Sequence, residues 1–516
     1  MARQSASPKR QTSWQQALLA YADKRAGIMA LLGFSAGIPI LLIFSSLSLW
    51  LREAGVDRST VTMFSWAALG YSFKFIWAPL IDALPLPVLT RTLGRRRGWL
   101  LVAQLMIIGA ILWMASVNPA NGAQLFAMAV GAVWLGFSSA TQDIVIDAYR
   151  IELADTQMQS VLSATYNAGY RIGMIVAGAG ALFLAEYFGS VKDAYIYEAW
   201  RNTYWVMAAV MGVGVATTLM IREPAVNRAP PERPVGDYAR LVLVFVCAVS
   251  AFVACFAGLS KLLPEVEGVL AGFLLEAITL VASLAAALGV GTALVHAGVV
   301  QKQVAVTTWV EPILDFFRRY GKSAFLLLLL IGLYRISDIV AGVISNVFYE
   351  DMGFSKSEIA TAVKLYGVIM VIIGGFVGGI IAQRFRIMQA MMIGGVLACM
   401  TNLMFVWLAS VGHNSLVMYL AVIMDNLASG LAGAVFIAFL SSLTSIRFTA
   451  VQYAIFSSLM TLIPKVLGGY SGTIVDNMGY AWFFTFTTLL GLPILALIYW
   501  VDKTVMAKPN DTAVVK

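Results

Sequence analysis

Long apolar runs separated by short charged or Pro- and Gly-containing segments make up most of this chain. A helix that crosses the hydrocarbon core of a bilayer needs roughly 20 mostly apolar residues. Cutting the chain wherever such runs are interrupted predicts fourteen membrane-spanning helices, in groups of six, two and six. They cover 27–50, 60–82, 99–117, 124–148, 159–187, 202–221, 241–260, 268–298, 323–347, 357–382, 390–410, 416–440, 451–476 and 480–501.

One further segment, 301–322, interleaves Trp309, Ile313 and Phe316 with charged residues, which predicts an amphipathic helix on the cytoplasmic membrane surface. The sequence therefore predicts an all-α, polytopic membrane protein that contains two six-helix bundles. The predicted parts are a cytoplasmic N-terminal segment (1–26), the first bundle (27–221), a cytoplasmic linker (222–240), two inserted spans (241–300), the amphipathic helix (301–322), the second bundle (323–501) and a cytoplasmic tail (502–516).

The distribution of basic residues predicts the orientation. With both termini in the cytoplasm, most of the 35 Lys and Arg residues lie in cytoplasmic segments, as the positive-inside tendency requires. The two bundles also show weak internal similarity, because "LREAGVDRSTV" after the first helix matches "YEDMGFSKSEI" (349–359). An even number of spans in each bundle makes this repeat parallel, which is typical of transporters built from two halves.

The composition narrows the function classes. A chain with 60% hydrophobic and only 12% charged residues lies outside the soluble range, and its net charge of +8 reflects topology instead of nucleic-acid binding. Two His and three Cys, with no CxxC pair, predict no metal and no cofactor. No nucleophile motif or catalytic loop domain is present, so an enzyme is not expected. Membrane lipids are the expected surroundings, and a monomer is the expected state.

Two cations lie near the middle of spans, where an unpaired charge costs roughly 2.5 to 3.5 kcal/mol. Arg171 lies in the fifth helix of the first bundle and Lys465 in the equivalent helix of the second. The repeat would therefore present one cation from each half to a central cavity, which suits an anionic substrate. The alternative is that each cation neutralises a buried carboxylate without touching substrate.

The fourth helix carries "SSATQDIVIDAYRIEL", with Asp143 and Asp147 one turn apart and Gln142 beside them. Asp143 is the better candidate for carrying a proton, because burial favours the protonated form of a carboxylic acid. Asp147 lies nearer the cytoplasmic end. We expect it to close that side through an ion pair with Arg95, Arg96, Arg97 or Arg150.

Other polar groups within the predicted spans extend the candidate site. Asp338 follows Arg335 by three residues, so that the two either neutralise each other or serve transport. Asp425 is a further candidate proton carrier. Candidate substrate contacts, in addition to those above, are Lys74, Asn426 and the aromatic residues Tyr71 and Tyr170, although aromatic side chains more often pack helices.

Several motifs resemble a known family. "APLIDALPLPVLTRTLGRRRGW" resembles the loop between helices 2 and 3 of the major facilitator superfamily, with Asp82 ending the helix and Arg95, Arg96 and Arg97 in the basic tail. In order along the first half, "GFSAGIPI", "FKFIWAPLID", "GRRRGWLL", "SSATQDIVIDAYR" and "GYRIGMIVAGAGAL" resemble the anhydromuropeptide permease (AmpG) family. The second half matches that family more by layout than by sequence.

This resemblance implies a major facilitator fold in the bacterial inner membrane and proton-driven import of GlcNAc-anhydroMurNAc-peptides for peptidoglycan recycling. It also implies an indirect role in β-lactamase induction and so in β-lactam resistance. Gly37, Ala140, Gln142 and Asp143 fall on family motifs and are implied in transport, and Asp82 with the arginine tail is implied in the cytoplasmic gate. Transport of another anion, such as an acyl-CoA, a drug or a peptide, remains an alternative, as does a lipid scramblase or a membrane-embedded enzyme.

Overall fold

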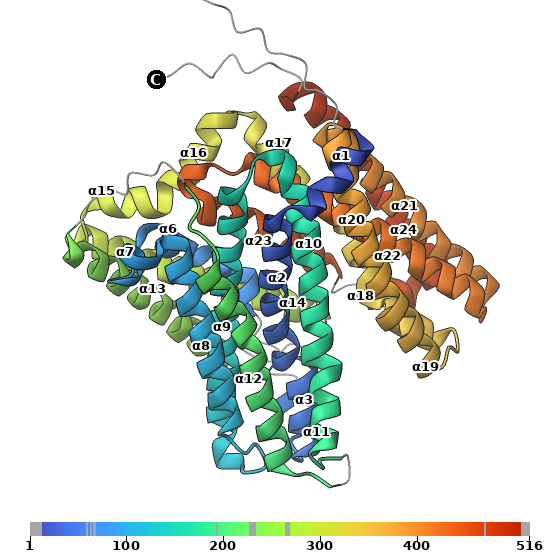
Figure 1. Cartoon of the computed structure of the whole chain (residues 1–516), viewed down its shortest axis with the longest axis horizontal. Helices are drawn as coiled ribbons and strands as arrows, with labels where there is room; N and C mark the ends of the chain where they lie inside the picture. The colour runs from blue at the N-terminus through green and yellow to red at the C-terminus, as the bar shows by residue number, and fades with distance from the viewer. Residues whose placement is uncertain are drawn as a thin grey trace, which may run out of the picture. The chain divides into compact units, whose positions relative to one another are not determined.

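The chain is almost entirely helical in a computed structural model, which describes residues 13–57, 60–61, 64, 69–191, 194–225, 234–263, 269–468 and 471–506 (Figure 1). In this part of the chain the only β structure is an isolated bridge between Val191 and Ala194. Thirteen of the described helices are long and apolar enough to cross a membrane. The predicted all-α, polytopic fold class is thereby confirmed, and the cytoplasmic placement of both termini stays a prediction.

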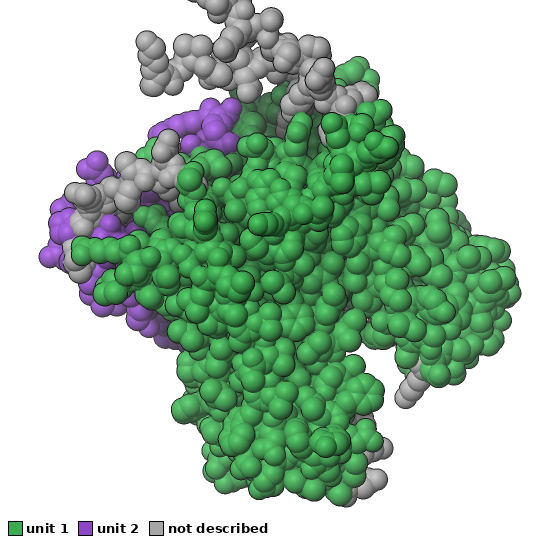
Figure 2. Space-filling model, viewed as in Figure 1, with its two compact units in different colours: residues 1–75, 86–226, 320–516 green, residues 76–85, 227–319 purple. Residues whose placement is uncertain are grey.

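Two compact units make up the chain, and Figure 2 colours them separately. Unit 1 consists of Met1–Phe75, Leu86–Val226 and Tyr320–Lys516, and so contains the second predicted six-helix bundle and all of the first except residues 76–85. Unit 2 contains Ile76–Pro85 and Asn227–Arg319, and so holds the inserted helices. The charged positions discussed below lie in unit 1, with the exception of Asp82.

The first half follows the predicted order of spans, with one gap. The span predicted at 60–82 falls partly outside the described residues, and its described parts include a short 3-10 turn at Lys74–Ile76. A π-helical segment, Val176–Gly180, joins two pieces of the fifth span. The helices are α1 (Trp14–Leu19), α2 (Lys24–Ile43), α3 (Ser45–Glu53), α5 (Leu69–Phe73), α6 (Ala78–Ala83, in unit 2), α7 (Leu89–Leu93), α8 (Arg95–Ala115), α9 (Leu125–Leu153), α10 (Thr156–Ile175), α11 (Ala181–Tyr187) and α12 (Tyr197–Met220).

Unit 2 has two long helices, α13 (Val235–Leu262) and α14 (Val269–His296), which pack against each other. Only 11% of the most apolar window of each is buried, as expected for helices that face lipid. The segment predicted to be amphipathic is helical, as α15 (Lys302–Ala305), a π-helical stretch and α16 (Glu311–Tyr320). It is not among the thirteen candidate spans.

The second half repeats the six-span order. Its first span is broken between α17 and α18, where Arg335 has non-helical backbone angles (φ −101°, ψ 12°). Gly479, with φ 77°, interrupts α24, and this break separates the last two predicted spans. The helices are α17 (Ser323–Leu333), α18 (Ile336–Asp351), α19 (Lys356–Ile359), α20 (Val368–Arg384), α21 (Ile387–Val411), α22 (Ser415–Leu443), α23 (Thr449–Gly468) and α24 (Ser471–Val501).

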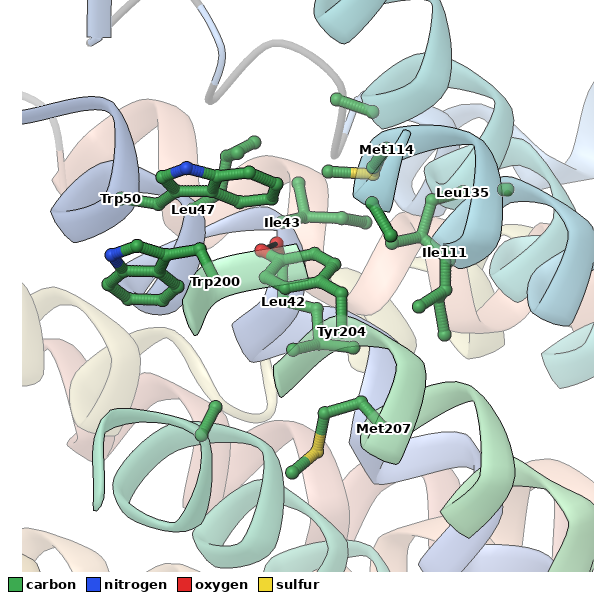
Figure 3. Close-up of a cluster of buried hydrophobic side chains, with 14 of the residues drawn as sticks. Leu42, Ile43, Leu47, Trp50, Ile111, Met114, Leu135, Trp200, Tyr204 and Met207 are labelled. Carbon is green, nitrogen blue, oxygen red and sulfur yellow. Dashed lines mark hydrogen bonds between the residues drawn. The ribbon is translucent and has the colours of Figure 1, made fainter. Parts of the chain in front are cut away.

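An aromatic cluster forms the core at the end of the first half where α3 meets α12 (Figure 3). The Trp50 and Trp200 rings are stacked, with centroids 5.7 Å apart and planes 2° apart, and Tyr204 packs at 4.7 Å from Trp50. Trp200 donates from its indole nitrogen to Glu53 Oε2 at 2.7 Å. The polar edges of these rings are thus satisfied while their faces are buried, which fixes this end of the bundle.

Glycine allows the closest helix contacts. A Cβ added at Gly37 or Gly169 would overlap a backbone oxygen of the facing helix, so that α2 and α10 pack backbone to backbone. The second half has a similar contact between α20 and α22, at Gly374 and Gly430. Small residues permit such approach, and in lipid it is stabilised by van der Waals packing.

These two closely packed pairs meet where the halves contact each other, because α10 lies against both α20 and α22. Ser160 Oγ donates to the Gly379 carbonyl oxygen at 3.2 Å. Farther along α10, a Cβ added at Gly375 would lie 3.9 Å from the Cβ of Ala164. Both of these contacts between the halves lie toward the N-terminal end of α10, which is also the side of the bundle on which α9 ends.

Candidate functional site

Three charged residues of the first half form a chain across two spans. Lys74, only 8% exposed, lies in the second span, and its Nζ is 3.5 Å from Asp147 Oδ2 on α9. The other carboxylate oxygen of Asp147 is 3.4 Å from Arg150 Nη2, one turn along the same helix. Asp147 therefore bridges two cations, and the nearly complete burial of Arg150 makes its counter-charge essential.

Asp143 lies one turn before Asp147, and the hydroxyl of Tyr166 donates to its Oδ1 at 3.3 Å. Gln142 beside it is fully buried, and neither polar atom of its side chain has a hydrogen-bond partner among the described residues. Ala140, on the preceding turn, is fully buried in the helix packing. An unsatisfied buried amide is costly, so Gln142 has free capacity to bind a polar ligand.

Arg150 joins the first half to the second. Its Nη1 donates to Ser441 Oγ on α22 at 2.9 Å and to Gln159 Oε1 at 2.8 Å. Its guanidinium also lies over the ring of Tyr453 on α23, 5.1 Å from the centroid. Our sequence reasoning saw Arg150 only as one possible partner of Asp147. The available signal was its place at the end of the "SSATQDIVIDAYR" motif.

The second half has its own polar cluster. Arg335 and Asp338 form an ion pair, and Ser429 on α22 accepts from Arg335 Nη2 at 2.8 Å and donates to Asp338 Oδ2 at 3.1 Å. Asp425, one turn from Ser429, accepts from Thr401 Oγ1 at 3.1 Å. The Arg335–Asp338 pair weighed from the sequence thus exists, and Ser429 and Thr401 were not expected.

Arg171 stands apart from these pairs. Its one polar contact among the described residues is between Nη1 and the Met174 sulfur, at 3.9 Å. Lys465 lies within α23, and its side chain is outside the described residues, so the predicted Arg171–Lys465 arrangement stays a prediction.

The aromatic and amide candidates lie nearby. Tyr71 and Ser139 form a hydrogen bond of 2.6 Å between α5 and α9. The Tyr170 ring is 6.1 Å from that of Tyr166, close to Asp143. Asn426 donates to the Val422 carbonyl at 2.8 Å on its own helix. Gly37 is buried, and its Cα lies against the backbone of Tyr170, so helix packing accounts for a glycine there.

The predicted gate residues divide into separate contacts. Arg96 is 1% exposed and makes a two-point ion pair with Glu152 at the end of α9, with a shortest distance of 2.6 Å. Glu223 caps α8, since its carboxylate accepts from the backbone nitrogens of Arg96 at 2.8 Å and Arg97 at 3.0 Å. The Arg97 side chain donates to the Thr218 and Leu219 carbonyls at the end of α12.

Arg95 is half-buried next to these residues. Asp82 is half-buried on α6, in unit 2. Glu152 and Glu223 are two carboxylate partners of the basic tail in the structure. Sequence reasoning missed both, because charged residues near span ends looked like ordinary topology signals.

Comparison with known proteins gives a consistent picture over nearly the whole chain. A family model described as "Major Facilitator Superfamily" matches residues 26–339. The "Putative transporter AmpG 4" of Rickettsia conorii is 28% identical over 487 residues, which are 94% of this chain and 98% of that protein. The "Anhydromuropeptide permease" of Escherichia coli K12 is 29% identical over 499 residues, 96% of this chain and 84% of that protein.

Solved structures resemble the fold. The proton:xylose symporter XylE, bound to 6-bromo-6-deoxy-D-glucose, has a TM-score of 0.57 at 12% identity and covers 95% of this chain and 96% of its own. A bacterial homologue of the iron transporter ferroportin in the outward-facing state has a TM-score of 0.59 at 10% identity. The match covers 93% of this chain and 99% of that protein. At these identities the likeness concerns the fold alone.

Proposed function

Since the chain belongs to the Major Facilitator Superfamily and is an inner-membrane transporter of the AmpG type, we propose that it imports anhydromuropeptides together with protons. The substrates would be GlcNAc-anhydroMurNAc-peptides, moving from the periplasm to the cytoplasm. Import of this kind recovers cell-wall fragments for peptidoglycan recycling and indirectly supports β-lactamase induction. The name of the Escherichia coli relative supplies the substrate class, and the intramembrane charges support it.

The observation that carries the proposal is the concentration of buried polar groups where the halves meet. A peptide on a lactyl-linked sugar is large, hydrophilic and net anionic, so it requires cations and amides within the bilayer. Arg171 has no carboxylate partner among the described residues, and Gln142 has unsatisfied polar atoms. These two residues are the strongest candidates for binding substrate. Lys74, Tyr71, Tyr170 and Asn426 complete the proposed lining, and Lys465 would join it from α23.

Proton coupling requires a carboxylate that alternates between charged and neutral forms. Asp143 and Asp425 each accept a hydrogen bond from a hydroxyl, whereas Asp147 and Asp338 are ion-paired. A carboxylate without a direct cation partner is the easier one to protonate in a low-dielectric site. We therefore rank Asp143 and Asp425 above Asp338 as proton carriers.

The end of the molecule that is closed determines from which side substrate can enter this conformation. The halves contact each other through Arg150, Ser160 and Ser441, at ends that the distribution of basic residues predicts to be cytoplasmic. In that orientation the conformation is closed toward the cytoplasm and ready to receive a periplasmic substrate. Rocking of the two bundles about the central site would then release it inside.

Uptake of a labelled anhydromuropeptide into vesicles, with and without an imposed proton gradient, tests the function. We expect gradient-driven accumulation by the wild type, loss of uptake in Arg171→Ala with normal membrane insertion, and loss of the gradient's effect in Asp143→Asn. Arg386→Gln, at an exposed ion pair, is the matched control and should transport normally. A wild type that ignores anhydromuropeptides but moves an acyl-CoA, a drug or another peptide would replace this proposal with a different anion carrier.

A further inference from the structure

The break in the seventh core helix places Arg335 at an unusual position. α17 ends at Leu333 and α18 begins at Ile336, within the span Ser323–Ser345. Arg335 is the N-cap residue of α18, and no side chain caps that helix start. The exposed N–H groups of a half-helix carry partial positive charge, and discontinuous membrane helices present such ends to anions. Arg335 therefore adds a full positive charge to an end that is already electropositive.

Arg335 is only partly satisfied. Its Nη2 contacts Asp338 and Ser429, but its Nε is buried without a hydrogen-bond partner among the described residues. A guanidinium has five N–H donors in a fixed fork, and it binds carboxylates most strongly with two of them in parallel. Arg335 thus has donor capacity left for a second carboxylate.

Arg171 approaches the same region from the other half. It lies on α10, about two turns beyond Ala164, where α10, α20 and α22 meet. Arg335 reaches α22 through Ser429, and α22 packs against α10. The positive charges of Arg171 and Arg335 act unfavourably on each other. A positive charge within a membrane needs an anion, and of these two arginines the described residues supply one only to Arg335.

We infer that a carboxylate of the substrate binds between Arg171 of the first half and Arg335 of the second, in competition with Asp338. This inference rests on the proposed function and assigns Arg335 a role in substrate binding. An anion bound there relieves the repulsion between the two arginines and links the halves across the site. The inference thus adds Arg335 opposite Arg171, and the Arg171–Lys465 arrangement expected from the repeat stays a prediction.

Competition for Arg335 also links substrate to protons. When the substrate draws the guanidinium away, Asp338 loses its counter-charge, although Ser429 still donates to it. The charged and titratable groups that face this cluster are Arg335, Tyr334 beside it, Asp425 on α22 and Arg171 on α10. Arg171 binds the same substrate carboxylate, so among the described residues it does not replace Arg335 as the counter-charge of Asp338. A buried carboxylate without a counter-charge is most stable when protonated. Substrate and proton should therefore bind with positive cooperativity, which is reciprocal.

Binding measured with the purified full-length protein in nanodiscs tests the site without requiring transport. The probes are a GlcNAc-anhydroMurNAc-peptide and the same compound with its carboxylates amidated. Arg171→Gln and Arg335→Gln should each weaken binding of the acidic probe by about 10- to 100-fold, the range expected for charged hydrogen bonds. The affinity of the double variant should be only slightly lower than that of the weaker-binding single variant, because the two arginines bind the same carboxylate. Arg386→Gln, far from any span centre, should bind like the wild type.

The amidated probe should bind the wild type weakly, and its affinity should not fall further in Arg171→Gln or Arg335→Gln. Arg335→Lys, which keeps the charge, guards against misfolding as the cause of a loss and should bind better than Arg335→Gln. Wild-type affinity should rise on mild acidification, whereas Asp338→Asn should bind tightly at both pH values, because nothing competes for Arg335. Wild-type binding that survives in Arg335→Gln would overturn the site and leave the proposed function standing. A wild type that binds neither probe would overturn both.

Discussion

The two halves carry an ion pair at the same point of their repeat, at the start of the third helix, but they bury it to different extents. In the first half Arg96 pairs with Glu152 at 2.6 Å, and their side chains are 1% and 5% exposed. In the second half Arg386 pairs with Asp502, also at 2.6 Å, but with 55% and 25% exposed. Equal distances do not imply equal energies, because water screens the second pair and not the first.

Helix packing differs between the halves in a similar way. The glycine-mediated contact joins the first and fifth spans in the first half (α2 and α10), but the second and fourth spans in the second half (α20 and α22). The repeat therefore preserves the order of helices without preserving which pair packs most closely. Because α10 lies against both α20 and α22, the contact between the halves is built from elements that are not equivalent.

Breaking the buried Arg96–Glu152 ion pair should have the largest effect on the free energy of unfolding. Arg96→Gln removes the buried cation that pairs with Glu152 at two points and should cost about 3–5 kcal/mol of unfolding free energy. The matched change Arg386→Gln in the second half should cost no more than about 1 kcal/mol. Reversible unfolding of the purified protein by SDS titration measures both values. Equal losses in the two variants would show that burial does not separate the two pairs.

Substitutions at the closest helix contacts should have the second-largest effect on stability. Gly169→Ala and Gly430→Ala each add a Cβ that overlaps a backbone oxygen of the facing helix, and each should destabilise the protein by about 1–3 kcal/mol or more. Gly212→Ala is the matched control, since a Cβ there meets nothing within 4 Å. Thermal unfolding followed by fluorescence-detected size exclusion compares the three. If the Gly169→Ala variant matched the control, backbone contact between α2 and α10 would not limit stability.

Substitutions at the N-terminal end of the first span of each half should have the smallest effect on stability. Asp23 caps α2 by accepting from the Arg25 backbone nitrogen at 2.8 Å, whereas Lys322 before α17 provides no side-chain cap. Hydrogen bonds from the Arg25 side chain hold the pKa of Asp23 below its ordinary value of 3.8. The ionised form is therefore favoured by folding, and this stability is present above the ordinary pKa and is lost as pH falls through the folded-state value.

Asp23→Asn retains the cap and removes the charge, so it should cost less than about 1 kcal/mol at neutral pH and nothing in strong acid. Lys322→Gln should show no such pH dependence. Unfolding free energies at neutral and acidic pH provide the test, and a loss in Asp23→Asn that persists in acid would contradict the assignment to charge.

The apolar runs predicted the spans well, because lipid requires every crossing helix to show a long apolar segment in its own sequence. The break within α24 at Gly479 also falls between the last two predicted spans. The partners of charged residues were harder to predict. The ion pair of Lys74 with Asp147 was not expected, because two positions separated by more than 70 residues meet only through helix packing. The expected contact of Lys74 with substrate stays a prediction.

By itself the sequence determined that this protein is a helical, multi-pass membrane protein, and it located the few charges that lie inside the bilayer. Hydrophobicity and charge are local properties, and they can be read residue by residue. The tertiary structure decided which of those charges are paired, that Arg150 joins the two halves, and that Arg171 has no carboxylate partner among the described residues. Distances between side chains on different helices determine electrostatic energies, and those distances arise only when the whole chain has packed.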